Sequence, residues 1–79
     1  MVRIEKIRST AYIVNGEQHI VADVQASTMA ELMLLGGVIG GAVLDPGSIV
    51  QDIQAGKFYT KDADGSWYNA DGSGAYTPA

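Results

Sequence analysis

The dipeptide Asn15-Gly16 constrains the fold of this chain more than any other feature of the sequence. It lies between two runs of alternating apolar and polar residues, and both of its residues tolerate the positive φ angles of a type I′ turn. The turn predicts a β-hairpin over residues 7–24, with Tyr12 opposite His19 and Ile7 opposite Val24. In this register the apolar residues share one face, which we expect to be the core face: Ile7, Ala11, Ile13, Ile20, Ala22 and Val24.

The other face of the predicted hairpin is polar, and we expect it to be mostly solvated. It carries Arg8, Thr10, Tyr12, His19 and Asp23. Arg8 lies opposite Asp23 in this register, which predicts a cross-strand charge pair. His19 is the only imidazole of the chain, and neither a nucleophile nor an orienting third group accompanies it. We therefore interpret His19 as a surface histidine and not as a general base.

A short helix is expected after this hairpin. Thr28-Met29-Ala30-Glu31 has the T-x-x-E pattern of a capping box. This pattern predicts that Thr28 caps the first turn and that Glu31 reaches back to the amide of Thr28. Gly36 is expected to end the helix after one or two turns.

The apolar run from Leu32 to Leu44 contains 13 residues without a charge, whereas a transmembrane helix needs about 20. Its paired glycines satisfy G-x-x-x-G, a pattern of helix dimers in membranes. In water such glycines weaken a helix, so we expect an apolar helix end followed by a flexible Gly-rich loop. The pattern leaves open whether this run belongs to the core or to an interface.

The second half of the chain predicts another hairpin. Residues 57–60 and 66–69 are aromatic and favour strands, and residues 61–65 between them form a turn with Gly65 in the left-handed region. Residues 49–55 fit either a strand or a short capped helix, and periodicity does not decide between them. We assign residues 1–69 to one small mainly-β domain of two β-hairpins, a β-meander, with one short helix and Gly-rich connections. Residues 70–79 are expected to form a flexible or partner-ordered tail.

Composition excludes several kinds of function. The chain of 79 residues has no cysteine and one histidine, which excludes a thiol nucleophile and a zinc site built from cysteines or several histidines. The net charge of −4 argues against a nucleic-acid partner. No dinucleotide, P-loop, nucleophile-elbow or metalloprotease motif is present. We therefore expect no enzyme activity, cofactor or metal, and no membrane partner.

Charge is unevenly distributed. Residues 1–8 hold three cations against Glu5, a sum of +2, and residues 9–79 hold two lysines against eight carboxylates, a sum of −6. A basic edge on an acidic body suits self-association or docking to another protein. The alternative is that these cations are solvated and protect a strand edge from pairing.

The run from Asp45 to Trp67 resembles small virion proteins of tailed bacteriophages. The residues that carry the resemblance are Pro46-Gly47-Ser48, then Gly56, then Phe58-Tyr59 and finally Gly65-Ser66-Trp67. The resemblance covers about a quarter to a third of the chain. It implies a β-meander, favours a strand at Ile49–Gln54, and implies a structural role on a capsid, neck or tail without catalytic residues.

We therefore expect a non-enzymatic virion protein, made in the host cytoplasm, that decorates or cements a capsid or links virion parts. Its expected partners are the major capsid protein or another virion protein, and further copies of itself in a homo-oligomer. The alternatives are a small cytoplasmic homo-oligomeric binding or regulatory module, and a membrane-active protein that uses residues 32–44. The candidate interface residues are Leu32, Leu34, Leu35, Val38, Ile39, Leu44, Tyr59, Trp67, Tyr68 and Tyr76.

Overall fold

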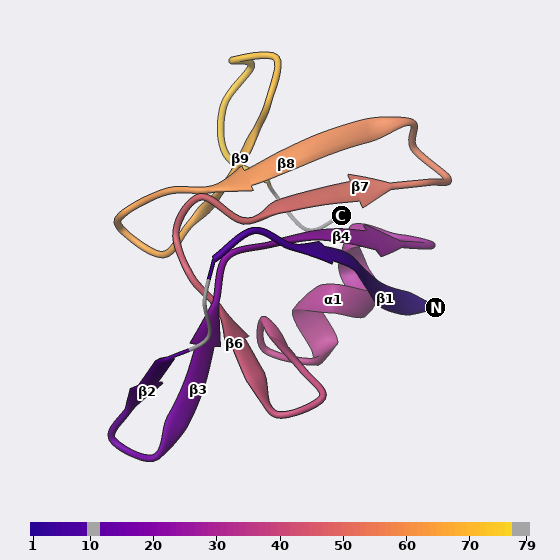
Figure 1. Cartoon of the computed structure of the whole chain (residues 1–79). Coiled ribbons are helices and arrows are strands. Elements are labelled where there is room, and N and C mark those ends of the chain that lie inside the picture. The colour runs from indigo at the N-terminus through magenta and orange to yellow at the C-terminus, as the bar shows by residue number, and fades with distance from the viewer. Residues whose placement is uncertain (10–11, 77–79) are drawn as a thin grey trace.

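A computed structural model describes residues 1–9 and 12–76 and shows a mainly-β domain of two sheets and one short helix (Figure 1). A five-stranded sheet has the order β1-β4-β7-β8-β9, and a four-stranded sheet has the order β2-β3-β6-β5. The elements are β1 (Val2–Ile7), β2 (Tyr12–Val14), β3 (Glu17–Ile20), β4 (Ala22–Ala26), α1 (Met29–Leu34), β5 (Val38–Ile39), β6 (Ala42–Leu44), β7 (Ile49–Asp52), β8 (Lys57–Lys61) and β9 (Trp67–Asn69). The predicted fold class is confirmed.

The Asn15-Gly16 turn is confirmed, but the hairpin that it closes is divided between the two sheets. Both turn residues have positive φ, 50° and 80°, and Tyr12 pairs with His19 as predicted. Beyond Val21 the register differs, because Ile7 pairs with Ala22 and not with Val24. The amides of Arg8 and Ser9 both donate to the carbonyl of Val21, so the chain passes from β3 into the other sheet at this residue.

This division changes which apolar residues are buried. Ile20, Ala22 and Val24 lie in the core as predicted. Ile7 and Ile13 are exposed, so their assignment to the core face is wrong. Ile13 lies on the hairpin that extends away from the five-stranded sheet (Figure 1), and Ile7 is the last residue of β1, at the edge of that sheet. Of the other predicted residues on this hairpin, Ala11 and Thr10 lie outside the described residues.

The predicted charge pair of Arg8 forms despite the changed register. Asp23 pairs with Lys6 along the backbone, yet the Arg8 Nε lies 2.7 Å from the Asp23 Oδ1. The guanidinium also donates to the carbonyl of Gly47. Arg8 therefore ties β1 to the turn between β6 and β7.

The helix α1 begins where the capping box predicts, but only half of that box is formed. The Thr28 hydroxyl accepts the amide of Glu31 at 3.4 Å. The Glu31 carboxylate does not reach back to Thr28 and instead binds the N-terminal amine of Met1. Beyond the C-cap residue Leu35, Gly36 adopts positive φ and the helical path ends, as predicted.

The Gly-rich run is a third hairpin and not a flexible loop, which corrects that expectation. Strands β5 and β6 pair antiparallel around Gly40-Gly41, whose φ angles are both positive. Strand β6 then pairs parallel with β3, and β7 pairs parallel with β4. These two parallel pairings join the first half of the chain to the second half.

The C-terminal half forms the meander that the resemblance implies. Ile49–Asp52 is a strand, so the helical alternative for this segment is wrong, and β7, β8 and β9 pair antiparallel in succession. Gly65 has positive φ in the turn, as predicted. Residues 70–76 fold back along β9, where Ala75 bridges to Tyr68 and the ring of Tyr76 packs edge-on against that of Tyr59. Residues 77–79 of the predicted tail lie outside the described residues.

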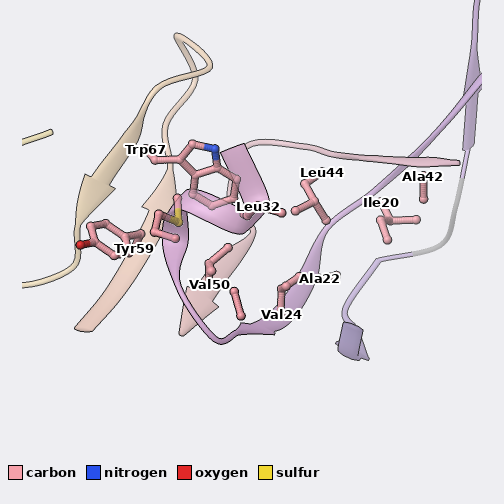
Figure 2. Close-up of a cluster of buried hydrophobic side chains, with 11 residues drawn as sticks. Ile20, Ala22, Val24, Leu32, Ala42, Leu44, Val50, Tyr59 and Trp67 are labelled. Atoms are coloured by element: carbon pink, nitrogen blue, oxygen red, sulfur yellow. The ribbon is translucent and has the colours of Figure 1, made fainter. Parts of the chain in front are cut away.

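One core joins the two sheets and the helix (Figure 2). Leu32 of α1 and Leu44 of β6 lie in its middle, with Trp67 and Tyr59 at one end and Ile20 at the other. Helix α1 packs on β4 and β7. This core fixes the body of the domain, and the β2–β3 hairpin extends from it (Figure 1).

Candidate docking arm and its anchoring cluster

The strongest candidate for a binding surface is the hairpin of residues 12–20, which we call the arm. It ends in three consecutive apolar side chains on the edge strand β2, where Tyr12, Ile13 and Val14 are exposed by 48%, 75% and 41%. Ile13 points to the face of the strand opposite that of Tyr12 and Val14, so both faces of this edge strand carry exposed apolar surface of the kind that marks interaction sites. The arm therefore has the composition of a docking element.

The edge of β2 is short, but it carries neither a charge nor a proline to prevent strand pairing. Strand β1, an edge of the other sheet, carries Arg3 and Lys6 and has a register shift between Ile4 and Lys6. Charges and bulges of this kind discourage pairing with another chain. Strand β2 has the sequence Tyr-Ile-Val, without a charge or a proline, so its edge is open to a partner.

A cluster of three polar side chains fixes the arm to the body, and we call it the Asp45 cluster. The Tyr12 hydroxyl donates to one oxygen of Asp45, and the His19 Nδ1 lies 2.6 Å from the other. Since a carboxylate only accepts hydrogen bonds, the imidazole donates from Nδ1. The rings of Tyr12 and His19 stack with their centroids 5.5 Å apart. Both strands of the arm are thereby joined to the turn after β6.

The surroundings of Asp45 favour the ionised form of its carboxyl group. Burial raises the pKa of the Asp45 carboxyl, but the hydrogen bonds from Tyr12 and His19 and the nearby charges of His19 and Lys61 outweigh burial and hold the pKa below its usual value. The same hydrogen bond raises the pKa of the Tyr12 phenol. At neutral pH the cluster therefore contains a carboxylate and a neutral phenol, the forms in which their hydrogen bond is charge-assisted.

The Asp45 cluster is suited to fixing the position of the arm. His19 is largely buried and not solvated, which corrects the surface interpretation, and its ring makes no other hydrogen bond in the described part of the chain. A general base needs a nucleophile or water within reach of its free nitrogen, and no side chain of residues 1–9 and 12–76 is hydrogen-bonded there. Over the same residues, no three metal-ligating side chains come together. The arrangement orients the arm by joining both of its strands to the turn that follows β6.

Sequence reasoning missed Asp45 as a site residue and named it only as the first residue of the run from Asp45 to Trp67. The signal that could have found it is the pairing of Tyr12 with His19. That register places two hydrogen-bonding rings side by side, and a largely buried imidazole needs a hydrogen-bond partner. The position of the acceptor depends on the parallel pairing of β3 with β6, which no local pattern indicates.

The predicted interface residues are divided by the fold. Leu32, Leu44, Tyr59 and Trp67 are buried in the core and offer no surface to a partner. Val38, Ile39 and Tyr76 are partly buried, and Ile39 and Tyr76 pack against the core. Leu34, Leu35 and Tyr68 are exposed, Leu34 by 89%. The predicted interface does not include Tyr12, Ile13 or Val14; the hairpin register assigns Ile13 to the core face and Tyr12 to the polar face.

Comparisons with known proteins do not assign a family. No protein-family model, no curated protein and no solved structure matches this chain. Among the described residues, no helix is long and apolar enough to cross a membrane.

The Asp45 cluster predicts a particular pH dependence of stability. Because the folded pKa of Asp45 lies below its unfolded value of about 3.9, the cluster stabilises the fold above that pH. This contribution is lost as the pH falls through the folded pKa. Urea unfolding of the native chain and of Asp45→Asn, between about pH 7 and pH 3, measures the difference. We expect the native advantage to be largest at neutral pH and to shrink below about pH 4. An advantage that stays constant with pH contradicts the assignment.

Proposed function

We propose that this protein is a non-enzymatic structural component of a tailed-bacteriophage particle, and that it docks onto a neighbouring virion protein through the arm. The observation that carries the proposal is the uncharged, exposed edge of β2, held out from the body by the Asp45 cluster. A strand edge of this kind can pair with a strand of another protein, whose backbone supplies the hydrogen bonds.

The arm is already folded and fixed to the body in the free chain, which strengthens the proposal. Association costs free energy for each loop and side chain that becomes ordered. The arm is a closed hairpin whose base is fixed by Tyr12 and His19 to a turn of the body. Docking therefore orders little of this chain, and the burial of Ile13 and Val14 contributes to affinity.

The meander of β7, β8 and β9 supports the phage context. It places Pro46-Gly47-Ser48, Gly56 and Gly65 at turns that separate or precede the strands, which is the arrangement expected from the resemblance. Leu34 and Leu35 form another exposed apolar group, at the end of α1. A chain with two such groups can contact two neighbours, which a protein that links virion parts or forms a homo-oligomer requires.

Replacing Ile13 by aspartate tests the docking surface. The Ile13 side chain is 75% exposed, so the change is expected to leave the fold intact and to place a charge on the docking edge. We expect Ile13→Asp to lower the amount of this protein in purified particles at least about tenfold, because a buried unpaired charge costs several kcal/mol. Quantitative mass spectrometry of gradient-purified particles measures the amount.

The matched control is Ile53→Asp, which places the same charge at an isoleucine that is 48% exposed in the turn after β7. This variant is expected to enter particles like the native chain. Equal incorporation of both variants contradicts docking through the arm. A native chain that binds a host protein and never enters particles instead favours the cytoplasmic binding module.

A further inference from the structure

A small pocket lies at the start of β8, on a different part of the molecule from the arm. Its volume is about 180 Å³, and its lining residues are Gly56, Lys57, Phe58, Asn69, Ala70 and Asp71. The Phe58 side chain is 51% exposed, on a strand whose neighbouring residue Tyr59 points into the core. The pocket therefore combines an exposed aromatic ring with charged and amide side chains.

The polar groups of the pocket include free donors and free acceptors. Asn69 donates from its amide nitrogen to the carbonyl of Gly74, which leaves its side-chain oxygen as an acceptor. One oxygen of Asp71 accepts the amide of Ser73 at 2.8 Å, and a carboxylate has two oxygens that can each accept more than one hydrogen bond, so Asp71 retains acceptor capacity for a ligand. Hydrogen bonds from Ser73 and the charge of Lys57 lower the pKa of Asp71, so the pocket contains a carboxylate at neutral pH.

A row of polar side chains continues from the pocket across the sheet. The strand registers align Phe58 with Gln51, Gln25 and Arg3 on the face opposite the core. The Arg3 Nε donates to Gln25 at 3.0 Å, and the Gln25 amide donates to Gln51 at 3.4 Å. The Gln51 side-chain nitrogen makes no hydrogen bond within the described residues, so the row ends beside Phe58 with a free donor.

We propose that this pocket binds one sugar unit of a neutral oligosaccharide, and that the Gln51–Gln25–Arg3 row contacts the following units. A sugar ring has an apolar C–H face, which suits the Phe58 ring, and hydroxyls that both donate and accept, which suit Lys57, Asp71 and Asn69. The charges of Lys57 and Asp71 balance, which matches a neutral ligand. A phosphate-bearing ligand is disfavoured because Asp71 repels it. This inference is independent of the proposed virion role.

Backbone amide NMR shifts test the proposal. The probes are the neutral trisaccharides maltotriose, cellotriose and triacetylchitotriose, each raised to about 10 mM, with glucose and N-acetylglucosamine as their single units. We expect at least one trisaccharide to shift the amides of residues 56–58, 69–71 and Gln51 and to saturate. Tighter binding of the trisaccharide than of its single unit assigns a polymer as the ligand. Equal binding assigns a free sugar and removes the role of the glutamine row.

Two variants and a control show whether the shifts come from this pocket. Phe58→Ala and Asp71→Asn are each expected to weaken binding about tenfold, because each removes one of the pocket's main contacts. Leu34→Ala removes an exposed apolar side chain outside the pocket and is expected to bind like the native chain. The proposal is overturned if no trisaccharide shifts these amides, if the shifts lie elsewhere, or if Phe58→Ala and Asp71→Asn bind as tightly as the native chain.

Discussion

Replacing Asp52 by alanine is expected to lower the free energy of unfolding by about 2–4 kcal/mol. Asp52 is buried, and its two oxygens accept the amides of Met29 and Ala55, each at 2.9 Å. The first of these amides begins α1, and the second lies in the turn between β7 and β8. Alanine would leave the buried amide of Met29 without an acceptor, and one lost carboxylate would loosen both segments. Urea unfolding followed by circular dichroism measures the change.

The control for this change is Asp62→Ala. Asp62 is exposed, and its carboxylate makes no hydrogen bond in the described part of the chain, so the expected loss is within about 0.5 kcal/mol. Asp52→Asn keeps one acceptor oxygen and is expected to fall between the two variants. If Asp52→Ala unfolds at the same urea concentration as Asp62→Ala, Asp52 does not hold the helix to the sheet.

A leucine pair at the end of the helix gives the second large effect. Leu32 is fully buried, whereas Leu34 is 89% exposed, although the two are separated by one residue. Leu32→Ala removes a core side chain and is expected to cost about 2–5 kcal/mol. A domain of this size has a total stability of only about 4–12 kcal/mol, so this variant is expected to lose a large share of it. Leu34→Ala is expected to cost less than about 0.5 kcal/mol.

Thermal and urea unfolding of the two leucine variants measure this contrast directly. Because the substitution is the same in both, differences in helix propensity between leucine and alanine nearly cancel. The contrast also separates core from interface within the apolar run Leu32–Leu44. Equal destabilisation by the two variants would mean that the helix packs with another face toward the sheet.

Local turn and cap chemistry explains what the sequence could predict. Asn15-Gly16 fixes the pairing near its own turn, Thr28 begins the helix, and Gly65 closes the second hairpin. Each of these signals acts over a few residues, and each is confirmed. The failures begin where a prediction needed to know which layer lies beneath a strand. Ile13 alternates correctly with its neighbours, but the core ends before it, so alternation did not imply burial.

The parallel pairings explain why the site was not predicted. Strands β3 and β6 are separated by β4, α1 and β5 in sequence, and their pairing is what brings Asp45 beside His19. Asp52 likewise reaches the start of α1 only because β7 lies beside β4. Such contacts depend on long-range topology, for which a single sequence has no local signal.

The most direct test of the account is the number of copies of this chain in purified particles. Under the proposed virion role, particles of a phage that encodes this chain are purified by density gradient, and the chain is quantified by mass spectrometry against the major capsid protein. A structural component is expected to keep a constant ratio to the major capsid protein across the particle peak, because the symmetry of the docking sites sets its number of copies. A chain that is expressed during infection and absent from the particle peak would contradict the structural role.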